Sequence, residues 1–227
     1  MWPAEPNVAL LDDKITAPTP ERIGLLGAGG QAREIASYLP RSTELFWAVS
    51  SDFLDTSSPD QIDVSSPSKR DRDSWVVAAV GPPAVRRDLV ALWPGNRFAT
   101  IISSAAYVEP SCRIGAGAVI APGAVLTVNV TVGEHCLVNV GATLSHDVEL
   151  GAFVTVGPGA NVGGRVRLGD GVFVGIGATI SNNVSIAPGA VIGAGATVLR
   201  DVVTPNAVVV GIPDTITRIR GDWLDAL

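Results

Sequence analysis

The chain has 227 residues, of which 47% are hydrophobic and 17% charged, and its formal net charge is −6. This length allows two modest domains, and the acidic balance argues against nucleic acid as a partner. We expect no membrane span, because no run of eighteen apolar residues occurs, and no secretory signal, because no basic region precedes an apolar core at the N-terminus.

Residues 1–21 contain four prolines and no sustained period. We interpret them as an N-terminal extension that is disordered or lies over a partner. At residue 22 the pattern changes, and a strand (23–26), a glycine turn (27–30) and a helix (32–39) are predicted. Glycines let backbone N–H groups approach a phosphate at a helix N-terminus. The spacing is not the full dinucleotide fingerprint, so a tight turn without a ligand remains an alternative.

The rest of this first region alternates apolar and polar stretches. We predict two strands, one helix and a last strand leading into the next region, at 44–50, 74–81, 83–92 and 97–102. Residues 51–73 are rich in Ser, Asp and Pro and are predicted to be a loop. The order of elements favours a small, parallel, Rossmann-like α/β domain over 22–98, which is too short for a complete dinucleotide-binding fold.

Residues 107–202 form sixteen six-residue periods (hexads) without an insertion. The second position is Val, Ile or Leu in every hexad, the sixth is Ala, Val or Cys, and the third is most often Gly. A period of six fits neither a helix nor a strand. It fits a chain that turns a corner every six residues and buries its aliphatic side chains by stacking. Cys112 and Cys136 occupy sixth positions, so we expect core residues of a cytoplasmic protein without disulfides.

After the repeats, residues 204–213 read TPNAVVVGIP. We expect this segment to close the repeat region. Residues 214–227 are predicted to be a short C-terminal tail, helical and packed on the outside.

The chain contains two histidines, His135 and His146, both within the hexads. If eighteen residues make one coil, His146, Gly164, Asn182 and Arg200 lie above one another along one edge, roughly 4.8 Å apart. A long polyanion such as coenzyme A fits such an edge, where Arg200 would meet its phosphates. A solvated turn position is the alternative for His146, and is favoured for His135.

Acyl transfer needs a base for the acceptor's proton, and imidazole suits that role near neutral pH. Asp147, the next residue, would raise the basicity of His146. The thioester oxygen gains charge in the transition state, and the Gly164 amide could donate to it. We expect direct transfer, with Ser145 left open as an acyl-carrying nucleophile. A zinc hydratase needs three histidine ligands, so no metal is expected.

A glycine-rich α/β region joined to hexads resembles the sialic acid O-acetyltransferase/NeuD-like family of hexapeptide-repeat acyltransferases. The segments that carry the resemblance are IGLLGAGGQAREI, VVAAVGPPAVRRDL, VNVGATLSHDVELGAFVTVGPGANVGGRVRLG and the run from VFVGIGATI to GIP. It implies a left-handed parallel β-helix over 99–213 with three hexads per coil. It also implies homotrimers with acetyl-CoA bound between neighbouring β-helices.

The resemblance assigns roles to individual residues of the repeats. His146 matches the catalytic base, Asp147 its acidic neighbour, and Asn139 an active-site asparagine. Gly164 matches a glycine whose amide contacts the thioester. Further positions match the cofactor-binding part of the family site, namely Ile176 and Ala194 in the coenzyme A channel and Thr155 where many members have a second histidine.

For the acceptor, the resemblance points to the glycine turn (Gly29, Gly30 and Gln31), to Gly81 and to the segment containing Asp52. Gln31 stands where many members have histidine. Pro82 and Pro83 replace a polar pair, and 50–52 (Ser-Ser-Asp) replaces paired acidic residues. The acetyl-CoA end of the site is therefore better supported than the sugar-nucleotide end.

The leading hypothesis is an acetyl-CoA-dependent acetyltransferase acting on the amine of a nucleotide-linked amino sugar in surface-polysaccharide synthesis. One alternative keeps the scaffold and acetylates a sugar hydroxyl, as in sialic acid O-acetylation. Another is a non-catalytic scaffold that binds a sugar nucleotide. An acceptor screen with acetyl-CoA held fixed distinguishes the three.

Overall fold

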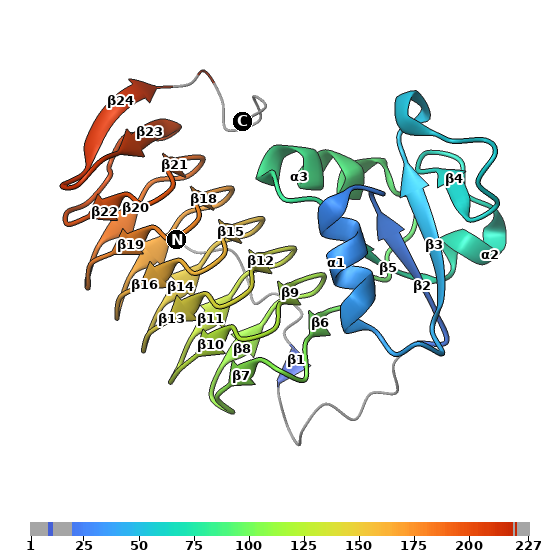
Figure 1. Cartoon of the computed structure of the whole chain (residues 1–227), viewed down its shortest axis with the longest axis horizontal. Coiled ribbons are helices and arrows are strands. Elements are labelled where there is room, and N and C mark those ends of the chain that lie inside the picture. The colour runs from blue at the N-terminus through green and yellow to red at the C-terminus, as the bar shows by residue number, and fades with distance from the viewer. Residues whose placement is uncertain (1–8, 11–19, 220, 222–227) are drawn as a thin grey trace.

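The computed structural model describes residues 9–10, 20–219 and 221. A stack of two-residue strands lies beside a small open sheet carrying helices, and the chain enters the stack at its lower end (Figure 1). Most of the predicted N-terminal extension lies outside the described residues. Within it, β1 (Ala9–Leu10) pairs antiparallel with β8 (Arg113–Ile114) at the end of one face of the stack.

The repeats form a parallel β-helix in which each strand occupies the first two positions of a hexad. Strands stack with a register of eighteen residues, as where Thr143 pairs with Asn161. Three sheets result, here called faces 1, 2 and 3 in chain order. This register is that of the left-handed β-helix implied by the family resemblance.

The strands of each face are as follows. Face 1 contains β6 (Ile101–Ile102), β9 (Val119–Ile120), β12 (Leu137–Val138), β15 (Thr155–Val156), β18 (Phe173–Val174) and β21 (Val191–Ile192). Face 2 contains β7 (Tyr107–Val108), β10 (Val125–Leu126), β13 (Thr143–Leu144), β16 (Asn161–Val162), β19 (Thr179–Ile180) and β22 (Thr197–Val198). Face 3 contains β8, β11 (Thr131–Val132), β14 (Glu149–Leu150), β17 (Arg167–Leu168) and β20 (Ser185–Ile186).

Between the faces lie three turning edges, called edge 1/2, edge 2/3 and edge 3/1. The second and sixth positions of the hexads point inward and form one continuous buried cluster. The fifth position has a positive φ in every hexad from 113–118 to 191–196. L-residues rarely adopt this conformation, which explains why glycine is common there. Edge 1/2 has glycine at all of these fifth positions, whereas edge 2/3 has Asn129, Asp147, Arg165 and Asn183.

The N-terminal region is a four-stranded parallel sheet in the order β4-β3-β2-β5. Its strands are β2 (Arg22–Leu26), β3 (Glu44–Val49), β4 (Gln61–Asp63) and β5 (Trp75–Ala78), and its helical elements are α1 (Gly30–Tyr38), η1 (Ser51–Phe53), α2 (Lys69–Arg72) and α3 (Pro83–Leu92). The predicted strands and both longer helices are therefore present. The predicted loop over 51–73 is wrong in part, since β4 joins the sheet there and α2 follows it.

Helix α1 lies between this sheet and face 1 of the β-helix. Its buried residues Ala32 and Ile35 share one apolar cluster with Val119 and Leu137, whose side chains point outward from face 1. Helix α3 packs on the opposite side of the sheet, where Leu89 and its neighbours form a second cluster. The two regions thus share an apolar interface, which fixes the sheet against the β-helix.

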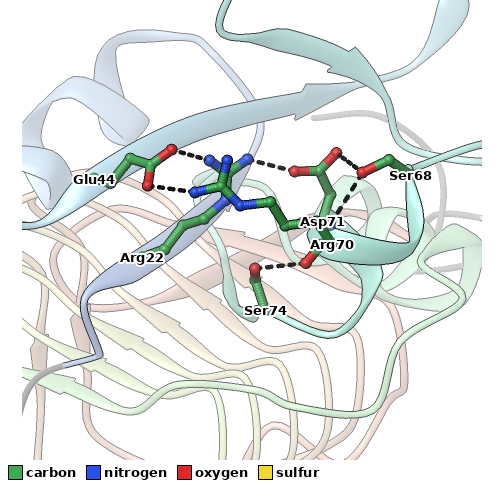
Figure 2. A network of polar contacts seen from close by, with 6 residues as sticks. All are labelled: Arg22, Glu44, Ser68, Arg70, Asp71 and Ser74. Carbon is green, nitrogen blue, oxygen red and sulfur yellow. Dashed lines mark hydrogen bonds and ion pairs between the residues drawn. The ribbon is translucent and has the colours of Figure 1, made fainter.

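A polar network ties together the amino-terminal ends of the strands (Figure 2). Arg22 pairs with Glu44 and Asp71, and its guanidinium lies 4.5 Å from the centroid of the Phe46 ring. Ser68 caps α2 by accepting the Asp71 N–H. Because the strands are parallel, their carboxyl ends all lie at the other edge of the sheet, away from this network.

Two further segments differ from the prediction. The strand expected over 97–102 is reduced to β6, and Phe98 forms only an isolated bridge with Val76 of the sheet. The tail was expected to be helical, but β23 (Ala207–Val210) and β24 (Thr215–Ile219) form an antiparallel pair. β-branched residues dominate both strands. β23 pairs parallel with β21 at the otherwise open end of face 1, and β24 adds to the outer side of β23. In the part of the chain that the structure describes, no helix is long and apolar enough to cross a membrane.

Candidate active site

His146 lies on edge 2/3, directly after β13. Its side chain is about half exposed, and Nδ1 lies 2.9 Å from Oδ2 of Asp147. Hydrogen bonds from His146 and from Asn129 hold the pKa of the Asp147 carboxyl below its ordinary value. An ionised carboxylate accepts hydrogen bonds only, so Nδ1 is the donor, and in the neutral ring the lone pair is on Nε2. The imidazole therefore presents an acceptor nitrogen away from Asp147.

Gly164 lies one coil further along the same edge, and the predicted stacking of His146 on Gly164 is confirmed. A Cβ atom added to Gly164 would lie 2.5 Å from Cε1 of His146 and nearer still to Nε2. A residue with any side chain would therefore push the ring away. The absence of a side chain at Gly164 is what allows the imidazole to occupy this position.

The next two positions of this edge are Asn182 and Arg200. Oδ1 of Asn182 accepts the Gly164 N–H at 2.8 Å. The Gly164 amide was expected to be a free donor for a thioester oxygen, but in this structure it is engaged. Arg200 is largely exposed, and its Nε lies 3.9 Å from Oδ2 of Asp214.

Asn139, Ile176 and Ala194 lie on edge 1/2, not on the edge that carries His146. They follow β12, β18 and β21 of face 1, and the whole of β13 separates Asn139 from His146. Ile176 and Ala194 are exposed, and a Cβ added to the intervening Gly177 would meet no atom within 4 Å. One chain therefore carries the predicted residues of the repeats as two half-sites on different edges.

The predicted acceptor residues come together at the carboxyl edge of the parallel sheet. Gly29 and Gly30 start α1, Asp52 lies in η1 after β3, and Gly81 follows β5. Added Cβ atoms at Gly29 and Gly81 would meet nothing within 4 Å. The Cα side of both glycines is thus uncovered at the place where open α/β sheets bind ligands.

Gln31 connects this carboxyl edge to edge 1/2. Its Oε1 accepts a hydrogen bond from Nδ2 of Asn139 at 3.2 Å, and Asn139 is buried. Oδ1 of Asn139 accepts the backbone N–H of Val140 at 2.8 Å, which orients the side chain. The first residue after the glycine turn therefore contacts one of the two half-sites.

Thr155 was expected at the cofactor, but it is buried between the two regions. Its hydroxyl donates to the Gly81 carbonyl at 2.7 Å and accepts from Nη2 of Arg86 at 3.0 Å. Its side chain is 3% exposed and belongs to face 1. The hydroxyl is thus engaged with protein groups of the N-terminal region.

Arg86 of α3 was not singled out from the sequence, yet it is fully buried at the same place. It donates to the carbonyls of Val80, Gly81, His135 and Phe153 and to the hydroxyl of Thr155. Burial lowers the pKa of Arg86 to about 10, so it remains a cation near neutral pH. Among the described residues it makes no ion pair. A sequence in which two arginines follow each other on a predicted helix does not show which one points inward.

His135 is a core residue and not part of either half-site. Its ring packs edge-on to Phe98, with centroids 4.7 Å apart, and stacks on Phe153 at 5.0 Å. Burial and the nearby Arg86 lower its pKa to about 4. The favoured interpretation of His135 as a solvated turn residue is wrong, because the residue lies at a turn but is only 6% exposed. No cluster of three or more His, Cys, Asp or Glu residues that could hold a metal ion occurs among the described residues.

Comparison with known proteins places this geometry in context. A model of the bacterial transferase hexapeptide (six repeats) matches residues 165–200. A GDP-perosamine N-acetyltransferase from Caulobacter crescentus, solved with CoA and GDP-perosamine, is 26% identical with a TM-score of 0.77, covering 86% of this chain and 96% of that chain. No curated protein matches the sequence significantly.

Two further structures are similar over most of both chains. The acetyltransferase domain of PglB from Neisseria gonorrhoeae, solved with acetyl coenzyme A, is 28% identical with a TM-score of 0.73, covering 87% of this chain and 100% of that chain. WeeI from Acinetobacter baumannii is 26% identical with a TM-score of 0.72, covering 86% and 98%. These likenesses confirm the resemblance to the NeuD-like family of hexapeptide-repeat acyltransferases, and with it the enzyme class of acyltransferase.

Proposed function

We propose that the chain is an acetyl-CoA-dependent N-acetyltransferase that acts on the amine of a nucleotide-linked amino sugar. The observation that carries the proposal is the arrangement of His146, which Asp147 orients so that Nε2 faces the open backbone of Gly164. The similar proteins support the choice of substrates, since one is bound to CoA and GDP-perosamine and another to acetyl coenzyme A.

In this proposal Nε2 of His146 takes a proton from the acceptor amine as its nitrogen attacks the thioester carbonyl carbon. The C–N bond forms, the C–S bond breaks, and the proton passes from the imidazolium to the departing thiolate. The Asp147 carboxylate stabilises the imidazolium and keeps the ring oriented. For the Gly164 N–H to stabilise the oxyanion, it must exchange the Asn182 carbonyl for the thioester oxygen.

The two substrates are assigned to different surfaces. The acceptor's phosphates would lie at Gly29 and Gly30, where the N-terminus of α1 and the open glycine backbone favour an anion. Asp52 and Gly81 lie at the same sheet edge and would contact the nucleoside and the sugar. Acetyl-CoA would lie along the exposed column of Ile176 and Ala194 on edge 1/2 and reach Asn182 and Arg200 on edge 2/3.

Because these columns lie on different edges of one chain, a complete site needs two chains. We therefore propose a homotrimer in which edge 2/3 of one protomer faces edge 1/2 of the next. Both cysteines are free and buried, so a reducing compartment suits the protein, and we propose the cytoplasm.

The first test is thiol release from acetyl-CoA in an acceptor screen. We expect turnover with an amino-sugar nucleotide and none with the matching hydroxy sugar nucleotide. Turnover with the hydroxy sugar alone would favour O-acetylation, and the absence of both turnover and acetyl-CoA binding would favour a scaffold.

The second test concerns the base. His146→Ala should lower kcat by about 10²–10⁴-fold, the usual contribution of a general base. Asp147→Asn should fall between that variant and wild type, and Ser145→Ala should retain activity because no acyl-serine is needed. Size-exclusion chromatography should show unchanged assembly for all three. Full turnover by His146→Ala in intact assemblies would remove the assignment.

A further inference from the structure

We infer that Arg86 and Thr155 form a latch that positions the acceptor-binding turn at Gly81 on the β-helix, and that Thr155 serves this latch and not the cofactor. This inference rests on the proposed function, because it concerns how the acceptor reaches its site. It is carried by the contacts between α3, the turn after β5, and face 1.

The guanidinium of Arg86 bridges two regions that are distant in sequence. On its own side it donates through Nη1 to the carbonyls of Val80 and Gly81, both at 2.8 Å. On the side of the β-helix it donates through Nε to the His135 carbonyl and through Nη2 to the Phe153 carbonyl, both at 2.7 Å. His135 and Phe153 belong to successive coils of edge 3/1, so the side chain holds two coils and one turn at once.

Thr155 completes the contact from the β-helix side. Its hydroxyl donates to the Gly81 carbonyl and accepts from Arg86, so the three groups form a closed triangle of hydrogen bonds. A planar guanidinium with five N–H groups suits this set of acceptors, whereas an ammonium has three N–H groups on one point. All three nitrogens of the guanidinium donate to acceptors in this buried position, which indicates a built contact and not an incidental one.

Gly81 has two distinct sides in this arrangement. Its carbonyl oxygen is held by Arg86 and Thr155, while the Cα side is open, since an added Cβ would meet no atom within 4 Å. The turn is therefore fixed on its carbonyl side and open on its Cα side, at the carboxyl edge of the sheet where the acceptor would bind. Loss of the latch should let this turn move relative to the β-helix without touching the column that would hold acetyl-CoA.

The decisive variant is Thr155→Val, which keeps the shape and the strand propensity and removes only the hydroxyl. We expect the acceptor KM to rise about tenfold, with the acetyl-CoA KM unchanged, because only the acceptor turn is released. Thr155→Ser restores the hydroxyl and should return the acceptor KM toward wild type. A role in stability alone would lower the melting temperature without this selective change in KM.

Arg86→Lys should have a larger effect of the same kind. The matched control is Arg87→Lys, the same change one residue further along α3, where Arg87 pairs with Asp88 at the surface. We expect no change in either KM for the control. If Arg86→Lys fails to fold, the Thr155 pair still decides the question.

Three outcomes overturn the latch. One is an unchanged acceptor KM in folded Thr155→Val, and another is a rise in the acetyl-CoA KM alone, which would return Thr155 to the cofactor. Hydrogen exchange gives a readout independent of turnover, since the backbone amides of Val80 and Gly81 should exchange faster in Thr155→Val than in Thr155→Ser. The third outcome that would overturn the latch is equal amide exchange at this turn in the two variants. If wild type itself acetylates no acceptor, the proposed function fails, while the exchange comparison still tests the latch.

Discussion

Gly164 shows how one missing side chain shapes the proposed base. Its backbone is not in the left-handed region, so alanine is sterically allowed by the main chain. The obstacle is the His146 ring, which is half exposed and free to turn toward solvent. We expect Gly164→Ala to change the free energy of unfolding by less than about 1 kcal/mol. Displacing the imidazole should lower kcat by about 10²-fold.

The neighbouring glycine provides the contrast. A Cβ added to Gly163 would meet the backbone nitrogen of Asn182 at 2.8 Å and the Ile180 carbonyl oxygen at 2.9 Å. Backbone atoms of the next coil cannot turn away, so Gly163→Ala should destabilise by about 1–3 kcal/mol. Chemical denaturation and steady-state kinetics on both variants check the pair. A strongly destabilised Gly164→Ala with normal kcat would contradict the reasoning.

For single residues, the sequence predicts which residues stack along one edge of the β-helix better than it predicts their hydrogen-bond partners. The eighteen-residue offset from His146 to Gly164 follows from the six-residue period together with the three hexads per coil that the family resemblance implies. The engagement of the Gly164 amide by Asn182 does not, because it depends on a side-chain rotamer. Arg86 contacts His135 and Thr155 across 49 and 69 residues of sequence, and no local pattern shows such contacts.

Among the elements, the junction between the open sheet and edge 3/1 has an unusual composition. His135 and Phe153 both have positive φ, at 55° and 58°, although neither is glycine. Their rings stack on each other, and the ring of Phe98, which lies between α3 and β6, packs edge-on against His135. A Cβ on Gly117 would lie 2.7 Å from Cε1 of His135, so that glycine makes room for the ring. Packing thus compensates for an unfavourable backbone.

The buried imidazole makes the stability of this junction depend on pH. The pKa of His135 is lowered from 6.5 to about 4, so the unfolded chain binds a proton between these values while the folded chain does not. Stability should therefore be full above pH 6.5, fall as the pH drops toward 4, and level off below that. The expected loss is on the order of 3 kcal/mol, at about 1.4 kcal/mol per pKa unit.

Urea titrations between pH 7 and pH 4 measure this slope. His135→Asn is the matched variant, because asparagine tolerates a positive φ and does not titrate. The variant should be less stable at pH 7 and should lose most of the slope between pH 6.5 and 4. An identical slope in both proteins would assign the pH dependence to other groups.

An element is easier to predict from the sequence when residues within it, and not distant strands, determine its structure. The hexads and the glycine turn before α1 are periodic or carry turn residues, and both are predicted with small errors at their ends. β4 and β24 are not predicted, because Gln61 to Asp63 and the tail pair with strands whose position is set elsewhere in the fold. The segment from Thr215 to Ile219 is β-branched in four of five positions, a signal that the helical interpretation of the tail did not use.

In the molecule as a whole, face 2 separates the two half-sites. Face 2 carries uncharged side chains at the outward first positions of its hexads, from Tyr107 to Thr197. Face 1 is covered in part by α1, and face 3 exposes charged residues such as Arg113, Glu149 and Arg167. In the proposed trimer, this uncharged face with a half-site on either side is the surface that a neighbouring protomer would cover.

If two neighbouring protomers share each active site, as proposed, trimers that mix two inactive variants should regain a predictable fraction of activity. His146→Ala disables edge 2/3, and Ile176→Glu places a negative charge on edge 1/2 where anionic acetyl-CoA would lie. Each variant alone should be inactive. In a random equal mixture of trimers, about one interface in four joins an intact edge 2/3 to an intact edge 1/2. Coexpression should therefore restore about a quarter of wild-type kcat per protomer, as measured by thiol release on purified mixed trimers. If each site lay within one chain, no mixture could exceed the sum of the two inactive variants, because every chain would carry a defect in its own site.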